Sequence, residues 1–334
     1  MRKNAAEISL GILGVSHGHP YSMSAFFNGY RREPLRQAYP HIEHYLEAAL
    51  PELRRIPGAR VNWIWAAEPA KAEHVAAICS IPHIARQPIE ILGKVDAVII
   101  TENAAETHLP LAEPFLDKGL PLFVDRPLAN CWEDTQVFWR RTGPDYPIMS
   151  CSNLRYNPAL PDFRTNAARI GETILLRGLS AMDWFGYGCH LAETLVQLWG
   201  RDPLSVQCTG QETKPVPVEW KDGAGHAHSI EAGDWTAEVW YQGRRRALLQ
   251  VFHPLAKTLQ VSIHGTKGHL DLPISDSFTM VRRLLDDFIA MIRTRRSPKD
   301  LMPDTLAVSR ILIGAHRSRA ERGRMVTLKE EFPL

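Results

Sequence analysis

Short apolar runs alternate with helix-like segments over roughly the first 145 residues, and this rhythm limits the possible folds more than any other feature. The runs Ile8–Val15, Val95–Ile100 and Pro121–Val124 are mostly apolar. Strands of this kind are typical of parallel sheets, because helices cover both faces of such a sheet. We therefore expect residues 1–147 to form an α/β domain with a doubly wound parallel sheet.

One connection in this domain is unusually long. The segment from residue 21 to residue 57 separates the first run from the next expected strand, Arg60–Ala66, and it carries several prolines. Connections between strands and helices normally span only a few residues. We interpret residues 21–57 as an insertion in the first crossover.

The second half has a different rhythm, with strand-like runs that no longer alternate with helices. These runs are residues 173–179, 205–209, 235–241, 246–252 and 259–264, and apolar residues at helical spacing follow between Val281 and Ile292. Gly243, Gly265 and Gly268 stand where turns are needed. Residues 148–334 are predicted to form an α+β domain with a large, mainly antiparallel sheet.

Charge and hydropathy exclude several classes of function. A formal charge of +2 on 334 residues provides no basic field, so we expect no nucleic-acid partner. The sequence contains no run of about 18 apolar residues, so we expect no membrane span and a cytoplasmic protein. The five cysteines are dispersed and odd in number, which favours free thiols.

The turn after the first run has the position of a dinucleotide-binding loop. Gly14-x-Ser16-x-x-His19 stands where a Rossmann-like domain carries G-x-G-x-x-G, with His17 and Gly18 between. Glycines in that motif let the backbone approach a diphosphate. Only the first glycine matches in register, and a purely structural turn is the alternative.

Glu68 follows the second expected strand, where a carboxylate can accept hydrogen bonds from the ribose hydroxyls of NAD and repel the phosphate of NADP. The alternative is an acid that stabilises the N-terminus of the helix beginning at Pro69. We expect NAD to be the cofactor.

A set of ordered motifs extends over nearly the whole chain apart from the first crossover. They are Val95–Asn103, His108, Ala112, Gly119, Phe123–Ala129, Asn153-x-Arg155-Tyr156-x-Pro158, Gly171–Thr173, Gly188-x-His190, Leu198-x-Gly200 and Gly265–Leu270. Together they resemble the glucose-fructose oxidoreductase, inositol dehydrogenase and rhizopine-catabolism family (Gfo/Idh/MocA). The resemblance implies an NAD-dependent oxidoreductase that acts on a sugar, polyol or related hydroxyl compound, and a homodimer or homotetramer assembled through the open sheet face.

The resemblance also implies which residues line the cofactor groove. Thr101, Glu102, Asn103 and His108 follow the fourth strand, and Asp125 and Arg126 follow the fifth. His108 has a second interpretation, in which it only caps its helix.

The chain departs from the family at the positions that carry the chemistry. Asp125-Arg126-Pro127 replaces E-K-P, and Gly186 replaces the aspartate of D-x-x-x-H before His190. Arg126 can hold a hydroxyl or an oxyanion, but a guanidinium cannot shuttle a proton. We therefore expect Arg126 to position the substrate and His190 to be the acid and base, assisted by Tyr187. A satisfied core histidine is the alternative for His190.

Five further residues are candidates for binding the substrate. His19, Asp183 and Trp184 are expected near the reacting centre, and Arg155 and Tyr156 are expected at the start of the second domain. A domain-interface role is the alternative for Arg155 and Tyr156, and a buried aromatic ring is the alternative for Trp184.

Histidine pairs such as His17-x-His19 raise the question of a metal. No HExxH pattern, cysteine pair or acidic cluster accompanies them, so we expect none. The substitutions at Arg126 and Gly186 leave two other functions open. One is an NAD-assisted lyase, hydrolase or epimerase without net redox chemistry, and the other is a non-catalytic ligand-binding protein.

Overall fold

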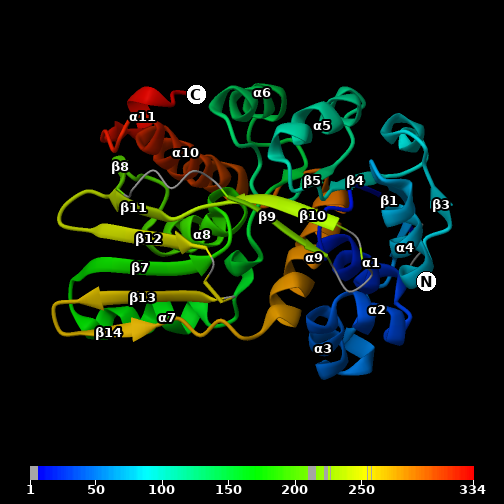
Figure 1. Cartoon of the computed structure of the whole chain (residues 1–334), viewed down its shortest axis with the longest axis horizontal. Coiled ribbons are helices and arrows are strands. Elements are labelled where there is room, and N and C mark those ends of the chain that lie inside the picture. Colours follow the sequence, from blue (N-terminus) through cyan, green and yellow to red (C-terminus); the bar gives the residue numbers. More distant parts are fainter. Residues whose placement is uncertain (1–6, 210–215, 222–224, 226, 254, 257) are drawn as a thin grey trace.

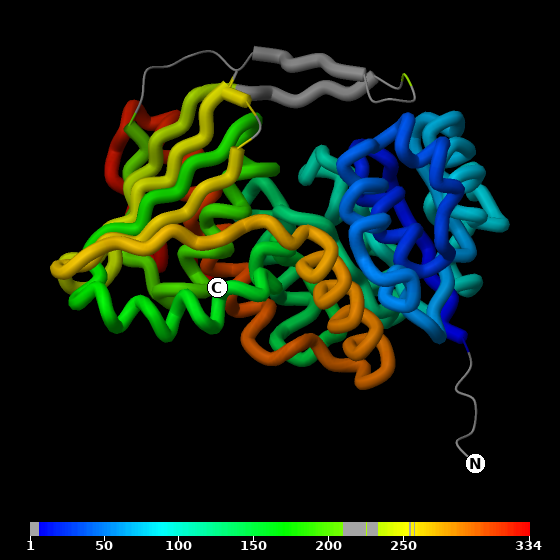
Figure 2. Tube along the Cα trace, turned by 90° about the horizontal axis from the view of Figure 1, so that it is seen from below, coloured from blue at the N-terminus to red at the C-terminus, as the bar shows by residue number. Residues whose placement is uncertain are grey.

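The computed structural model describes residues 7–209, 216–221, 225, 227–253, 255–256 and 258–334. Two sheets lie side by side, and each has its own hydrophobic core (Figures 1 and 2). The predicted α/β class is confirmed, with a parallel sheet at the N-terminus and a mixed sheet after it.

Six parallel strands form the N-terminal sheet in the order β3-β2-β1-β4-β5-β6. They are β1 (Ile8–Leu13), β2 (Ala59–Trp65), β3 (His83–Ile84), β4 (Ala97–Ile100), β5 (Leu122–Val124) and β6 (Ile148–Met149). The connecting helices include α1 (His19–Asn28), α4 (Pro69–Cys79), α5 (His108–Asp117) and α6 (Trp132–Thr142), with 3-10 turns at Pro88–Ile91 and Ala105–Thr107. The strand order reverses between β1 and β4, where open α/β sheets bind ligands.

The crossover from β1 to β2 contains α1 and an added part. The added part consists of α2 (Arg32–Ala38), α3 (Pro40–Ala48) and a 3-10 turn at Pro51–Leu53. A Cβ atom on Gly18 would lie only 2.8 Å from Ile42 of α3 and 3.1 Å from Tyr39. The added helices therefore pack directly on the loop that precedes α1.

The second sheet has the order β14-β13-β7-β12-β11-β8-β15 and is antiparallel except for the β7–β12 pair. Its strands are β7 (Thr173–Ala181), β8 (Ser205–Cys208), β11 (Trp235–Trp240), β12 (Arg246–Phe252), β13 (Leu259–Gly265), β14 (Gly268–Asp271) and β15 (Val326–Thr327). Core residues of α7 (Leu160–Ala167), α8 (Cys189–Trp199) and α10 (Leu301–Ala320) pack against this sheet. A separate antiparallel pair, β9 (Val216–Lys221) and β10 (Ala227–Ala232), and the short α11 (Leu328–Glu331) complete the elements.

Helix α9 (Ser277–Thr294) belongs to the core of the first sheet, although it follows the second sheet in the chain. Leu284, Leu285 and Phe288 are at most 3% exposed, and the Phe288 ring lies 5.9 Å from that of Phe123 on β5. Figure 1 shows α9, in orange, beside α1 and α3. The chain thus crosses back to the first unit, so a boundary at residue 147 leaves out part of that unit's core.

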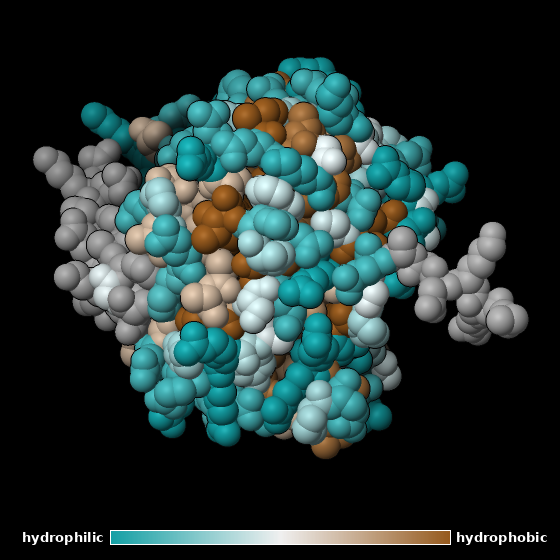
Figure 3. All heavy atoms as spheres, turned by 90° about the vertical axis from the view of Figure 1, so that its right-hand side faces the viewer, coloured by the Kyte–Doolittle hydropathy of each residue, from teal (hydrophilic) through white to brown (hydrophobic). Residues whose placement is uncertain are grey.

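Apolar residues appear as separate patches among hydrophilic ones on the face of the first unit shown in Figure 3. Among the described residues, no helix combines the length and the hydropathy that a bilayer crossing requires.

Candidate active site between the two sheets

The loop between β1 and α1 begins with a sharp turn. Gly14 has a φ of 101°, a conformation that favours glycine. The Thr101 hydroxyl at the end of β4 donates to the Gly14 carbonyl at 2.7 Å, and the Thr101 side chain is fully buried. These two residues join the ends of β1 and β4 at the point where the strand order reverses.

Glu102 and Asn103 lie against the same loop. The Ser16 hydroxyl donates to the Glu102 carboxylate, and the Asn103 amide donates to the Ser16 carbonyl at 3.4 Å. A Cβ atom on Gly14 would lie 2.6 Å from Cγ of Glu102. The Glu102 carboxylate therefore lies directly over the first glycine of the predicted motif.

His108 is fully buried at the start of α5. Its Nε2 lies 2.9 Å from the Glu102 carbonyl and its Nδ1 lies 3.2 Å from the Leu128 carbonyl. The ring therefore joins the loops after β4 and β5. The ring is enclosed, and it contacts carbonyls of these loops without capping α5.

Asp125 follows β5 and holds two imidazoles. Its Oδ2 lies 2.5 Å from Nδ1 of His19 and 3.2 Å from Nε2 of His17, and its Oδ1 accepts the Arg126 N–H at 2.9 Å. Burial alone would raise the pKa of Asp125. The charge of His19, hydrogen bonds from His17 and His19, and the charge of Arg126 outweigh burial and hold this pKa well below its usual range.

Arg126 meets the second unit. Its guanidinium carbon lies 5.8 Å from the centre of the Tyr187 ring, and among the described residues its buried Nε atom has no hydrogen-bond partner. Residues of both units, including Arg126, Ser152 and Cys189, line a small cavity here. A half-buried guanidinium with one nitrogen left without a partner can bind a substrate oxygen.

A π-helical turn, η6 (Trp184–Gly188), presents Tyr187 to Arg126. Met182 just before it has a φ of 81°, which is rare for a residue with a side chain, and the Asp183 carboxylate accepts the Gly186 N–H at 2.5 Å. Strained backbone and π-helical turns are both frequent at functional sites. The regular helix α8 begins only after this turn, at Cys189.

Trp184 points away from this site. The ring is 1% exposed, lies parallel to Trp235 at 5.2 Å, and donates from its indole nitrogen to the Leu312 carbonyl. A sugar ring cannot stack on a side chain that is enclosed in this way. The buried-aromatic alternative describes Trp184, and Asp183 caps the π-helical turn in place of facing a substrate.

His190 is buried in the first turn of α8. Its Nδ1 lies 2.6 Å from the Ser152 hydroxyl, and the Tyr187 ring contacts its ring edge-on at 5.8 Å. Arg126, Tyr187 and His190 are therefore consecutive contacts across the boundary between the two units. The predicted catalytic residues lie together, with Tyr187 between the other two.

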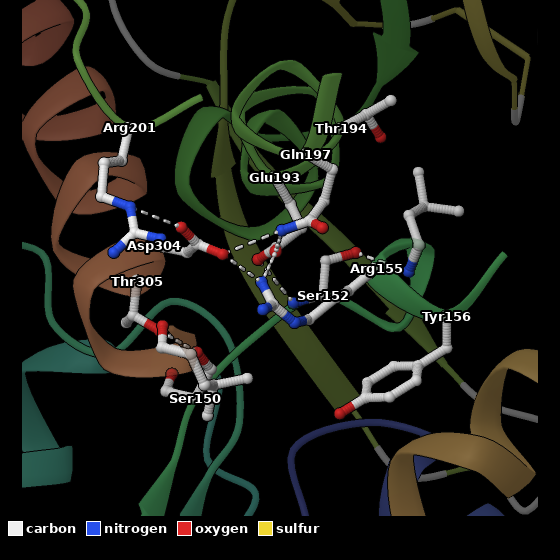
Figure 4. A network of polar contacts seen from close by, with 12 residues as sticks. Ser150, Ser152, Arg155, Tyr156, Glu193, Thr194, Gln197, Arg201, Asp304 and Thr305 are labelled. Carbon is white, nitrogen blue, oxygen red and sulfur yellow. Dashed lines mark hydrogen bonds and ion pairs between the residues drawn. The ribbon is translucent and has the colours of Figure 1, made fainter. Parts of the chain in front are cut away.

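Arg155 and Tyr156 belong to contacts that hold elements together (Figure 4). Arg155 donates to Glu193 of α8 at 3.2 Å and to Asp304 of α10 at 2.8 Å, and the Tyr156 hydroxyl donates to Asp287 of α9 at 2.9 Å. The domain-interface alternative fits Tyr156, because α9 belongs to the core of the first sheet. Arg155 instead joins two helices of the second unit through its Nη1 atom.

Known proteins resemble this chain in structure rather than in sequence. The sequence matches no protein-family model and no curated protein. A myo-inositol dehydrogenase from Lactobacillus casei, in complex with NAD(H) and myo-inositol, superimposes with a TM-score of 0.68 at 13% identity, covering 96% of each chain. An oxidoreductase from Agrobacterium radiobacter, in complex with NAD+, L-tartaric acid and magnesium, gives 0.70 at 15% identity, covering 98% of this chain and 100% of that one.

A myo-inositol dehydrogenase from Corynebacterium glutamicum ATCC 13032 gives 0.68 at 15% identity, covering 96% of this chain and 98% of that one. The chain has the inositol dehydrogenase fold. The fold that the sequence motifs imply is therefore confirmed over nearly the full length.

In a fold of this type a dinucleotide would lie along the strand ends, and residues with the chemistry to bind it stand at two places there. Glu68 is 67% exposed after β2, beside Lys71 at 2.8 Å, and can reach a ribose. Glu68 is also the N-cap residue of α4, and its side chain makes no capping hydrogen bond, so the alternative of an acid at the helix N-terminus acts through the helix dipole alone. Gly14 has no side chain but is covered by the Glu102 carboxylate, and Arg126 and Tyr187 lie at the opposite end. The residues present fit NAD if the Glu102 side chain moves away from Gly14.

The diphosphate part of the loop differs from the usual cradle. In Rossmann-like domains, N–H groups at a helix N-terminus bind the diphosphate. Here the N–H of His19 donates to Nδ1 of His17 at 3.2 Å, and Pro20 has no N–H. The Glu102 carboxylate adds a negative charge at the same place. We expect binding of a dinucleotide to be weaker than a glycine-rich loop would give.

Several contacts at this site were not predicted from the sequence. The hydrogen bonds of Asp125 to His17 and His19 span more than 100 residues, and neither Ser152 nor Asp304 carries a local pattern. The signal in the sequence for the contacts of Asp125 was the His17-x-His19 spacing, together with an aspartate at the position of the family glutamate.

Proposed function

We propose that this chain is an NAD-dependent oxidoreductase that oxidises a hydroxyl group of a sugar, a polyol or a related compound. The observation that carries the proposal is the buried, unpartnered Nε of Arg126, which meets Tyr187 from the opposite unit. The shared fold with NAD-bound dehydrogenases supports it. Membership of the Gfo/Idh/MocA family is part of the same proposal.

Gly14, Ser16, Glu68, Thr101 and Asn103 are the residues that would hold the dinucleotide. When bound, NAD supplies an acceptor for hydride. Every other element of the chemistry comes from the chain itself.

Arg126 binds the substrate oxygen and stabilises negative charge on it. Burial alone would lower the pKa of Arg126, but the nearby Cys189 and Asp125 raise it, so the guanidinium stays charged. His190, oriented by Ser152, lies one contact further into the second unit. Tyr187 closes the space between them and helps to exclude water.

The test is a fluorescence titration of the chain with NADH, followed by a polyol and sugar screen for absorbance of reduced cofactor. We expect saturable binding and turnover, and no binding at millimolar cofactor would overturn the proposal. Arg126→Met should abolish turnover while leaving NADH binding within about twofold, because its role is with the substrate. Glu68→Arg should shift the preference toward NADP by removing the ribose carboxylate.

A second function has a specific observation in its favour. Two N–H groups at the start of α1 are not available, since that of His19 bonds His17 and Pro20 has none, and Arg126 cannot shuttle a proton as the family lysine does. Both features suit an enzyme without net redox chemistry, such as a lyase or an epimerase. Product analysis with no added NAD distinguishes the two functions, because a simple dehydrogenase gives no product under those conditions.

Homodimer or homotetramer formation also stays a proposal. A shallow groove on the second sheet is lined by Arg177, Leu179, Gln250, Gln260 and Ser262, on the face opposite the helices. Light scattering after size exclusion gives the mass of the assembly. A monomer at micromolar concentration would contradict the proposal.

A further inference from the structure

Asp125 and the histidines beside it are arranged so that the carboxylate can orient a histidine that acts as an acid and base. Asp125 is 2% exposed, and its partners among the described residues are the N–H of Arg126 and the rings of His17 and His19, each of which can donate to a carboxylate. A carboxylate in this setting is ionised and fixed in place. Such a group can hold an imidazole in one tautomer and stabilise the imidazolium that forms when it takes up a proton.

His17 is a fixed, neutral member of this arrangement. Its Nδ1 accepts the N–H of His19, so its proton is on Nε2 and faces Asp125. Burial, and secondarily the charge of His19, lower the pKa of His17 to about 3. His17 therefore does not take up a proton near neutral pH. It occupies one side of the carboxylate and leaves the other side to His19.

His19 is the member that reaches the exterior. Its side chain is 37% exposed, and Nδ1 is the ring atom that contacts Asp125. When His19 is neutral and Asp125 is ionised, the single ring proton is on Nδ1, which leaves the Nε2 lone pair free among the described residues. Arg126, next to Asp125 in the chain, supplies a positive charge for an oxygen that loses its proton.

The same three side chains could be taken for a metal site, because one ligand atom from each lies within 4.8 Å of the others. The hydrogen bonds argue against it. A histidine bound to metal through Nε2 carries its proton on Nδ1 and donates it. Nδ1 of His17 instead faces the N–H of His19, so metal binding would bring two donors together. The neighbouring guanidinium would also repel a cation.

We propose that His19 is the catalytic residue that exchanges the substrate proton, with Asp125 and His17 as positioning residues. This inference rests on the proposed function and deepens it. The O–H bond of the substrate breaks, the proton goes to Nε2 of His19, and the electron pair stays on the oxygen beside Arg126. His19 thereby supplies the proton transfer that Arg126 cannot.

The first experiment reads the tautomer directly, without substrate or cofactor. The full chain is labelled with 15N in its 14 histidine rings, and long-range proton–nitrogen spectra are recorded above neutral pH. His19→Gln assigns the signal, and His83→Gln, at an exposed ring elsewhere in the first unit, is the matched control. We expect the proton of His19 on Nδ1, and Asp125→Asn should move it toward Nε2.

Two results would overturn the proposal. One is a wild-type His19 with its proton on Nε2, which is decisive even if Asp125→Asn does not fold. The other is purified chain that contains about one metal ion per molecule, released by His19→Gln and measured by elemental analysis.

The second experiment separates this proposal from the proposed function. Where a polyol is oxidised, His19→Gln should lower kcat by about 100-fold or more and remove its dependence on pH, with KM changed little. His190→Gln should keep that pH dependence. Full turnover in His19→Gln overturns the inference and leaves the oxidoreductase proposal intact. If no substrate is oxidised, the tautomer measurement still decides the role of His19.

Discussion

Arg155 is the residue on which the polar contacts between the helices of the second unit depend. It lies between Glu193 and Asp304, and both carboxylates are nearly buried (Figure 4). Replacing it with methionine leaves two buried negative charges without their shared cation. We expect Arg155→Met to lower the free energy of unfolding by about 3–5 kcal/mol, measured by urea denaturation.

The control for this prediction is an exposed ion pair. Arg246 and Glu238 lie 3.2 Å apart on the surface, and Arg246→Met should cost less than about 1 kcal/mol. Equal effects of the two substitutions would show that Arg155 is not a centre of stability. They would also reopen a role for it in substrate binding.

His17 predicts how stability depends on pH. Its pKa is about 3 in the folded chain and near 6.5 in the unfolded chain, so the unfolded state binds more protons between these values. Stability should therefore fall as pH decreases below 6.5, by about 1.4 kcal/mol per pH unit, or about 2 kcal/mol at pH 5. Urea denaturation at pH 7, 6, 5 and 4 measures this slope.

His17→Gln should flatten the slope, because glutamine takes up no proton in either state. His83→Gln, with its exposed ring, should leave it unchanged. Parallel stability curves for the wild type and His17→Gln would mean that folding does not lower the pKa of His17, so that its ring takes up a proton equally in the folded and unfolded chain.

At the scale of elements, the ease of prediction follows from how each element is buried. β1, β4 and β5 are covered on both faces, so they consist mostly of apolar residues and can be recognised as strands from the sequence. β3 and β6 have two residues each and carry no periodic signal. Helix α10 was not predicted, because it buries residues on most of its sides and lacks the single apolar stripe of α9.

The candidate site was predictable where the motifs are local. The family-like segments located Arg126, Tyr187 and His190, which lie in sequence on either side of the boundary between the units. The partners of these residues come from distant parts of the chain, and a hydrogen bond such as that between Ser152 and His190 leaves no pattern in the sequence. The contact of Glu102 with the loop after β1 was missed for the same reason.

That contact predicts the behaviour of the loop. The Glu102 carboxylate lies over Gly14 and bonds Ser16, where a diphosphate would carry its charge. We expect Glu102→Gln to tighten NADH binding about fivefold, equivalent to about 1 kcal/mol, because one repulsive charge is removed. Fluorescence titration measures the dissociation constant.

Glu106→Gln is the matched control, since Glu106 is an exposed glutamate on the next turn that bonds Asn130. It should leave the dissociation constant unchanged. Weaker binding in Glu102→Gln would show that the carboxylate contacts the cofactor favourably, for example through a ribose hydroxyl, and that the diphosphate lies elsewhere.

At the scale of the whole molecule, the two units depend on each other through α9. Its residues Leu284, Leu285, Phe288 and Ile289 are buried in the core of the first sheet, more than 130 residues beyond the end of that sheet at Met149. Large-to-small changes at such positions cost about 2–5 kcal/mol each, and a whole domain is stable by about 5–15 kcal/mol. Loss of the entire helix therefore removes more stability than the unit possesses.

We accordingly expect a fragment of residues 1–150, which keeps all six strands of the sheet, to show no cooperative urea transition and no near-ultraviolet circular dichroism of packed aromatic rings. Adding a synthetic peptide of residues 275–299 should restore both signals, whereas a peptide with Leu285 and Phe288 changed to serine should not. If the fragment unfolds cooperatively on its own, α9 is not required for the first unit to fold. The expected boundary at residue 147 would then separate two independent domains. Rescue by the native peptide alone would show that the first unit is completed by a helix encoded after the second.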